Sequence, residues 1–152
     1  MRNYWDKINL ELASAIIMRS KIASEVHEDY IEALVLQVPV VEAFLRTTIT
    51  EKIGHEKKSH KKYWDGDSKF SELIKYYELL GGKEELIAEL IKYNTMRNKI
   101  IHSTLQYSSI KTLISDAKSN YELGFKLIKK FLKILGYKIP VDFDKPFSEF
   151  PD

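Results

Sequence analysis

The stretch "KEELIAELIKYNTMRNKIIHST", residues 83–104, decides how the chain is interpreted, because it predicts a helix whose apolar side turns polar. At about 100° per residue, one stripe of this helix lies within about 40° of Asn98, and a second lies about 100° from it. The first contains Ile87, Ile91, Asn94, Asn98, His102 and Leu105, the second contains Leu86, Leu90, Tyr93, Arg97 and Ile101, and the opposite side carries Glu85, Glu89, Lys92 and Lys99. Arg97, Asn98 and His102 are therefore expected on the broad apolar side of the helix, towards its C-terminal end.

Such a placement has a cost. An arginine that leaves water without a partner is strongly disfavoured, and a buried amide or imidazole needs its hydrogen bonds satisfied. Two explanations are open: the polar groups form a structural network, or they line a cleft that water and a ligand enter.

A polar residue also interrupts the helix expected at residues 28–53. Its apolar stripe contains Ile31, Val35, Val38, Glu42, Ile49 and Ile53. Arg46 lies one turn after Glu42 and is placed to pair with it within the helix. Glu42 is equally a candidate to reach across to Arg97 and hold its guanidinium group. Both pairings are compatible with a buried polar contact that only fixes how the helices pack.

The rest of the pattern predicts an all-α fold in one domain, residues 1–152. Amphipathic helices are expected at 4–26, 28–53, 69–80, 83–104 and 109–135, with Pro39 removing a backbone donor from the second and Gly81-Gly82 ending the third. Four long helices and one short one, joined by short connections, predict an antiparallel bundle. Residues 138–152 are too proline-rich for a helix and are expected as an extended tail packed on or near the bundle.

Composition excludes several classes of protein. The chain has no cysteine, which excludes disulfides, thiolate metal sites and a cysteine nucleophile. His55 and His60 lack nearby paired carboxylates, so no metal site is expected, and no cofactor motif is found. No apolar run is expected to span a bilayer, and the polar N-terminus "MRNYWDKINLEL" lacks a signal core. A cytoplasmic protein without a membrane partner is the prediction.

The net charge of +2 does not by itself indicate a nucleic-acid partner, but the basic residues are unevenly distributed. The segment "HEKKSHKK", residues 55–62, contains Lys57, Lys58, Lys61 and Lys62. Two interpretations stay open for it: a solvated connector, or a contact with RNA phosphates.

The spacing Arg97-Asn98, three residues, then His102 resembles the signature of the HEPN family of small all-helical domains. The surrounding sequence "KYNTMRNKIIHS" is also similar to that family's usual context, and the motif lies on the penultimate long helix. The resemblance covers the predicted bundle in architecture and residues 93–103 in sequence.

The resemblance implies a metal-independent endoribonuclease, plausible as a toxin or defence effector. His102 would move the proton of the ribose 2′-hydroxyl, and Arg97 would stabilise the phosphorane. Asn98 would orient the imidazole or donate to a phosphate oxygen, with Glu42, Arg46 and Asn94 as supporting residues.

The resemblance also implies partners. In an ideal helix the side chains of Arg97 and His102 point about 140° apart around the helix axis, so one chain does not direct both at the same substrate. Members of the family form a homodimer in which the two copies share one cleft. An antitoxin or a nucleotidyltransferase is a further partner that the family implies. The family's partnered toxins carry a tyrosine two residues after the histidine, whereas this chain has Thr104 there, with Tyr107 as the nearest tyrosine. The alternative reading is a non-catalytic helical module that binds RNA, nucleotide or a protein through the same polar cleft.

Overall fold

The structure is a computed structural model that describes residues 8–53 and 69–138. These residues form five α-helices and no strand, which confirms the predicted all-α class. The elements are α1 (Leu10–Lys21), a π-helical segment η1 (Ile22–Val26), α2 (Tyr30–Ile53), α3 (Phe70–Leu79), α4 (Glu84–His102), a short 3-10 turn η3 (Thr104–Gln106) and α5 (Ile110–Leu135).

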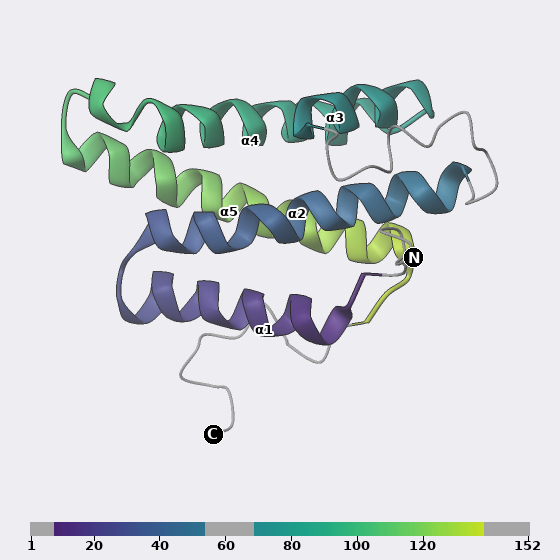
Figure 1. Cartoon of the computed structure of the whole chain (residues 1–152), viewed down its shortest axis with the longest axis horizontal. Helices are drawn as coiled ribbons and strands as arrows, with labels where there is room; N and C mark the ends of the chain where they lie inside the picture. Colours follow the sequence, from purple (N-terminus) through teal and green to yellow (C-terminus); the bar gives the residue numbers. More distant parts are fainter. Residues whose placement is uncertain (1–7, 54–68, 139–152) are drawn as a thin grey trace.

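Two helical hairpins build the fold (Figure 1). The first joins α1 to α2, and the second joins α4 to α5, with α3 beside α4. In Figure 1, α1 lies on one side, α2 and α5 run through the middle, and α3 and α4 lie on the other side. Glu89 on α4 pairs with Lys130 and Lys126 on α5, at 2.5 and 3.8 Å, and Lys99 nearer the end of α4 lies 3.6 Å from Asp116 near the start of α5. The two helices therefore run in opposite directions (Figure 1).

The central pair, α2 and α5, runs in the same direction. Gln37 Nε2 donates to the Tyr121 carbonyl, and Tyr137 near the end of α5 donates to Glu51 near the end of α2. In chain order α3 comes between the two hairpins, so α2 and α5 are not consecutive helices and need not be antiparallel. This parallel pairing departs from a bundle in which all packed neighbours are antiparallel.

Local signals explain several helix ends. Asn9 caps α1 by accepting from Leu12 N at 3.0 Å, and Ser109 caps α5 by accepting from Thr112 N at 3.1 Å. Gly136 ends α5 in the left-handed conformation, with φ +68°. The two ends of α5 lie at the predicted positions, whereas α1 begins at Leu10 and not at residue 4 as expected. Pro39 lies inside a continuous α2 on its exposed side.

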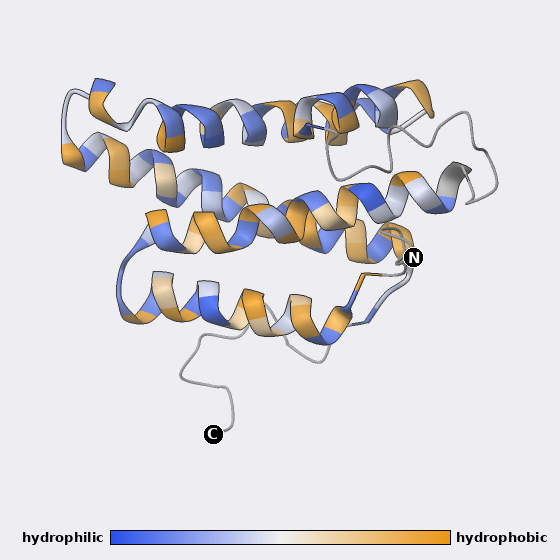
Figure 2. Ribbon diagram, in the orientation of Figure 1, coloured by the Kyte–Doolittle hydropathy of each residue, from blue (hydrophilic) through white to orange (hydrophobic). Residues whose placement is uncertain are grey.

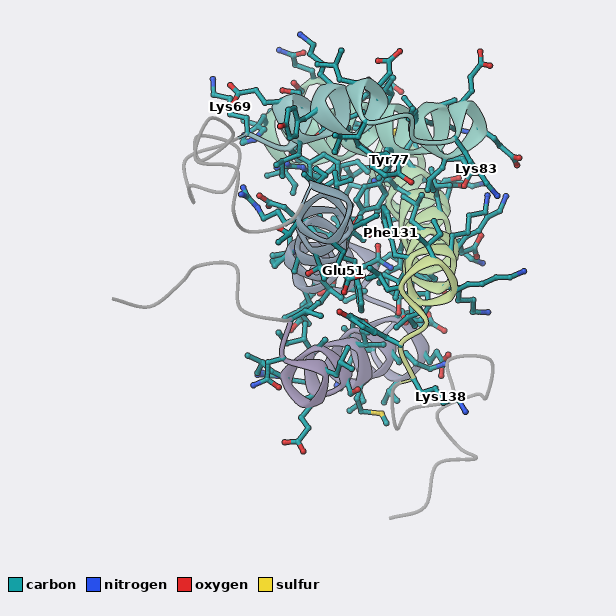
Figure 3. The ribbon with its side chains drawn as sticks, turned by 90° about the vertical axis from the view of Figure 1, so that its right-hand side faces the viewer. Glu51, Lys69, Tyr77, Lys83, Phe131 and Lys138 are labelled. Carbon is teal, nitrogen blue, oxygen red and sulfur yellow. The ribbon has the colours of Figure 1, made fainter. Side chains whose placement is uncertain are left out.

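The core surrounds α2, whose side chains are buried on most sides, while the outer helices are amphipathic (Figure 2). Tyr77 on α3 meets Phe131 on α5 edge to face, with ring centroids 6.5 Å apart, inside the bundle (Figure 3). By length and composition alone, residues Tyr30–Glu51 meet the criterion for a membrane-crossing helix, contrary to the expectation that no run does. Buried core helices meet the same criterion, and 56% of this window is buried within the bundle.

Candidate functional site

The motif of α4 lies at its C-terminal end, but its polar residues are not buried as predicted. Asn98 and His102 are exposed, and Arg97 is half-buried. Their apolar neighbours on the same stripe are exposed too, with Ile91 at 51% and Leu105 at 99%. The prediction that this stripe belongs to the buried side is therefore wrong for Ile91, Asn98, His102 and Leu105, while Asn94 is half-buried.

These side chains are exposed because the neighbouring helices do not extend over them. The buried residues of α4 are Leu86, Ile87, Leu90, Tyr93 and Ile100, which face α3 and α5. α3 begins at Phe70, whose ring lies 6.3 Å from that of Tyr93. Among the described residues, α3 thus covers the first part of α4 and leaves the Asn98 side of its last two turns open.

We call the exposed row of Ile91, Asn94, Asn98, Ile101, His102 and Leu105 the α4 strip. Asn94 is its half-buried member, and the strip contains three apolar and three polar side chains. A surface of this composition suits a contact with another molecule better than it suits bulk water.

Arg97 lies beside the α4 strip and faces the bundle. Its Nη2 donates to Asn94 Oδ1 at 3.3 Å, and its guanidinium carbon lies 5.9 Å from the centre of the Phe70 ring. Asn94 thus contacts Arg97 within one turn of α4. Phe70 was missed, because the sequence showed it only as an apolar residue at the start of a helix. The cation–π contact leaves most guanidinium N–H groups available to an anion.

Glu42 pairs with Arg46 within α2, at 3.2 Å from Nε and 2.8 Å from Nη2. The alternative pairing of Glu42 with Arg97 does not occur, for a geometric reason. α2 and α4 run in opposite directions and meet where Tyr93 donates to Gln37. Along the common axis, Glu42 lies five residues from that point in one direction, and Arg97 lies four residues from it in the opposite direction. At 1.5 Å per residue the two side chains start roughly 13 Å apart along the axis. Glu42 and Arg46 are therefore not part of the Arg97 site.

A second group of side chains fixes the end of α4. Tyr107 Oη donates to Asp116 Oδ2 at 2.8 Å, and Lys99 Nζ lies 3.6 Å from the same oxygen. Lys99 also lies 4.8 Å from the centre of the Tyr107 ring. Burial and the hydrogen bond to Asp116 raise the pKa of Tyr107 to about 12. The segment after His102 is thereby attached to α5.

The buried polar network of the protein lies elsewhere, and sequence reasoning missed it. Tyr93 Oη donates to Gln37 Oε1 at 3.0 Å, Gln37 donates to the Tyr121 carbonyl at 2.9 Å, and Asn120 Nδ2 donates to the Tyr93 carbonyl at 3.2 Å. Burial raises the pKa of Tyr93, which keeps its hydroxyl a donor. We call Gln37, Tyr93, Asn120, Tyr121 and the adjacent Gly124 the central polar layer. Its members come from three helices, so no local pattern could reveal them.

The remaining predicted residues lie outside the described part of the chain. Lys57, Lys58, Lys61 and Lys62 fall within residues 54–68, and the predicted tail lies beyond Lys138. Within residues 8–53 and 69–138 no three His, Cys, Asp or Glu side chains are grouped as a metal site. The described site is thus made of Arg97, Asn94, Asn98 and His102.

No family model matches this chain, and no curated protein or solved structure matches it.

Proposed function

We propose that this protein is a metal-independent endoribonuclease of the HEPN type, acting in the cytoplasm as a homodimer. The observation that carries the proposal is the Arg97-Asn98-x-x-x-His102 spacing on the last turns of α4, with Asn98 and His102 open to solvent. An exposed imidazole on the same helix end as a half-buried guanidinium group is accessible to an RNA strand. The same proposal includes the finer fold, a HEPN-like bundle of four long helices and one short helix, with α2 and α5 running in the same direction.

The chemistry needs only this chain's side chains. His102 removes the proton from a ribose 2′-hydroxyl, the 2′-oxygen forms a bond to phosphorus, and the bond to the 5′-oxygen breaks. The imidazolium then returns a proton to the leaving 5′-oxygen, which gives a 2′,3′-cyclic phosphate and a 5′-hydroxyl. Arg97 stabilises the charge on the phosphorane oxygens. Asn98, one turn before His102 on the same strip, orients the imidazole or donates to a phosphate oxygen.

A dimer would complete the site. Arg97 is directed towards Asn94 and Phe70, whereas His102 faces solvent, so one protomer presents them obliquely. A two-fold axis at the α4 strip would place two copies of each group around one cleft. Ile91, Ile101 and Leu105 supply the apolar contacts that such an interface buries.

Regulation belongs to the same proposal. A nuclease that cuts cellular RNA must be restrained, so a toxin or defence effector would have an antitoxin or a nucleotidyltransferase as partner. Two hydroxyls in the segment after His102 are already engaged: Thr104 Oγ1 donates to the Ile100 carbonyl, and Tyr107 donates to Asp116. Lys57, Lys58, Lys61 and Lys62 are proposed as contacts with RNA phosphates.

The test is cleavage of mixed tRNA, mRNA and rRNA by the purified protein in EDTA. Wild-type protein is expected to leave cyclic phosphate ends, and His102→Ala and Arg97→Ala are expected to lose at least about a hundredfold in rate. His27→Ala and Arg19→Ala remove an exposed histidine and an exposed arginine elsewhere, so they should keep full activity. Equal cleavage by His102→Ala and wild type, with both folded, would refute the proposal.

The second candidate is a non-catalytic binding module. It is favoured by the large exposed apolar side chains around the end of α4, Leu105 at 99% and Ile110 at 76%. A folded protein that binds RNA without cutting it, and loses that binding in Arg97→Ala, would support this candidate over the enzyme.

A further inference from the structure

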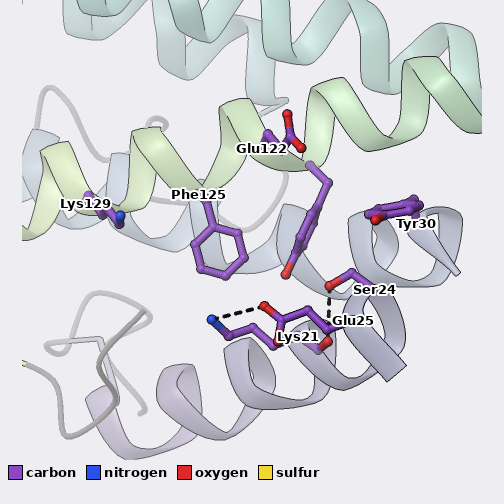
Figure 4. A pocket seen from close by; sticks show the side chains of 8 residues that line it. Lys21, Ser24, Glu25, Tyr30, Glu122, Phe125 and Lys129 are labelled. Carbon is purple, nitrogen blue, oxygen red and sulfur yellow. Dashed lines mark hydrogen bonds and ion pairs between the residues drawn. The ribbon is translucent and has the colours of Figure 1, made fainter. Parts of the chain in front are cut away.

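Arg97 is a half-buried basic side chain that forms no ion pair within residues 8–53 and 69–138. The other buried or half-buried basic side chains that the structure describes are paired with glutamates, at 3.4, 2.8 and 2.5 Å: Lys21 with Glu25 (Figure 4), Arg46 with Glu42, and Lys130 with Glu89. A guanidinium group that is partly removed from water without a counter-ion costs stability. The exception therefore points to an anion from outside the described chain.

The polar contact of Arg97 is an amide. Its Nη2 donates to Asn94 Oδ1 at 3.3 Å, one turn earlier on α4. An amide oxygen accepts a hydrogen bond and so directs the guanidinium group, but it carries no net charge and does not neutralise the arginine. A carboxylate at the same position would also direct the group, and it would cancel much of the charge that an anion could use.

The apolar contact of Arg97 is an aromatic ring that is fixed in the core. Phe70 is 4% exposed, its ring centroid lies 6.3 Å from that of Tyr93, and Tyr93 is held by its hydrogen bond to Gln37. The guanidinium carbon of Arg97 lies 5.9 Å from the centre of the Phe70 ring. An aromatic ring attracts a cation through its quadrupole and accepts none of its N–H groups in a conventional hydrogen bond. Phe70 thus restricts Arg97 to one side without lowering its charge.

We propose that Asn94 and Phe70 are positioning residues, which hold Arg97 in one orientation and leave its charge unpaired for a phosphate oxygen of RNA. A cation that is oriented before the substrate arrives stabilises developing charge without a further cost of ordering. The consequence for cleavage rests on the proposed ribonuclease function. The orientation of Arg97 is a property of the folded protomer and is measured separately.

The first measurement is the ¹H–¹⁵N heteronuclear NOE of the Arg97 Nε–Hε group in the ¹⁵N-labelled protein, assigned by its absence from Arg97→Ala. An oriented side chain gives a larger NOE than a mobile one. We expect a clearly larger value for Arg97 than for Arg19, which is exposed. In Asn94→Ala and in Phe70→Leu, the value for Arg97 should fall to that of Arg19.

Phe131→Leu is the matched control for Phe70→Leu. Phe131 is also a buried ring, and it packs on Tyr77 rather than on Arg97. Both variants remove a ring from the core and should lower the urea midpoint, but only Phe70→Leu should release Arg97. Asn94 is half-buried at the surface, so Asn94→Ala should fold normally and tests the proposal even where the core variants unfold.

The second measurement is the rate of RNA cleavage. Asn94→Ala should lower kcat by about tenfold and change KM by less than about twofold, because the charge of Arg97 remains but is no longer directed at the phosphorane. In the Arg97→Ala background the same substitution should have no further effect, since it acts through Arg97. A general structural role of Asn94 would lower the rate in both backgrounds.

Asn94→Asp separates orientation from charge. The new carboxylate should pair with Arg97 one turn away, keep its NOE high, and still lower kcat at least as much as Asn94→Ala. Thr95→Asp is the matched control, because it adds the same charge at an exposed position of α4 that points about 200° away from Arg97 around the helix axis. Thr95→Asp should cleave RNA at close to the wild-type rate.

Three outcomes would overturn the proposal: a wild-type NOE for Arg97 no larger than that of Arg19, an NOE that Asn94→Ala and Phe70→Leu leave unchanged, or equal losses of rate for Asn94→Ala with and without Arg97. A folded wild-type protein that does not cleave RNA would refute the proposed function instead. The NOE series would then still decide whether Asn94 and Phe70 orient Arg97.

Discussion

Polar side chains occur in two contrasting regions on and around α4. In the central polar layer, the side chains of Gln37, Tyr93 and Asn120 are buried, and each makes a hydrogen bond to another helix. In the α4 strip, Asn98 and His102 are exposed among apolar side chains.

The difference separates structure from function. Buried polar groups that are fully hydrogen-bonded fix the helices relative to one another, and each lost partner costs stability. Exposed polar groups among apolar ones contribute little to folding and stay available for a partner. We therefore expect substitutions in the central polar layer to change the free energy of unfolding, and substitutions in the α4 strip to change association or activity.

The largest loss of stability is expected for Gly124→Ala. A Cβ at this position would lie 1.8 Å from Gln37 Oε1 and 2.8 Å from Tyr93 Cε2, so Gln37 must move and its hydrogen bonds to α4 and α5 break. We expect a loss of about 3 kcal/mol, measured by urea unfolding. Ser119→Ala, at an exposed position of the same helix, should change the free energy by less than about 0.5 kcal/mol. Equal stability of the two variants would contradict the tight packing of this layer.

Tyr93→Phe tests the same layer without a steric clash. It removes the donor to Gln37 Oε1, and an acceptor deprived of its buried partner costs about 2 kcal/mol. The measurement is again the urea midpoint. Tyr30→Phe is the control, since Tyr30 is half-buried at the edge of the core, and it should cost less than about 0.5 kcal/mol. Similar losses for the two tyrosines would mean that the hydrogen bond contributes nothing specific.

Tyr107, in the segment that follows the α4 strip, makes stability depend on pH. Its folded pKa of about 12 lies above the ordinary value of 10.0, so its contribution is fully present below pH 10 and is lost as the pH rises to about 12. Wild-type stability should fall across this window, and Tyr107→Phe should fall less steeply. Urea midpoints at several pH values measure both slopes.

Asp116→Asn provides the second variant for this prediction. It removes the charge that accepts from Tyr107, so it should also flatten the slope. Unchanged slopes in both variants would exclude Tyr107 as the source of the pH dependence.

The smallest effect on stability is expected for Leu105→Ser in the α4 strip. Leu105 is 99% exposed, so the free energy of unfolding of the protomer should change by less than about 0.5 kcal/mol. Self-association, measured by sedimentation velocity, should weaken. Leu79→Ser is the matched control. Leu79 is 80% exposed at the C-terminal end of α3, outside the α4 strip, so this variant should leave association unchanged. Identical association of both variants would remove the strip from the dimer interface.

The helices themselves could be predicted because their signals are local. Ser109 and Gly136 mark the two ends of α5, and the turn at Gly81 separates α3 from α4, where φ is +85°. Capping hydrogen bonds and left-handed turns involve residues only a few positions apart, so the sequence contains all of the information.

The site was predicted only in part. The direction of Arg97 towards the bundle follows from its position on the helix, and its contact with Asn94 lies within one turn. The contact of Arg97 with Phe70 and the exposure of His102 depend on where α3 begins relative to α4. The apolar periodicity of a single helix contains no information about that position. The Glu42–Arg46 pair followed from i,i+4 spacing, whereas its separation from Arg97 followed from helix direction.

The sequence by itself determined that this chain forms amphipathic helices and that Arg97, Asn98 and His102 share the end of one of them. The tertiary structure decided that α2 and α5 run in parallel, that Gln37, Tyr93 and Asn120 meet in the core, and that Asn98 and His102 face solvent. The physical reason is that periodicity fixes the direction of a side chain around its own axis. Whether that direction leads into a core or into water depends on the length and position of the neighbouring helices.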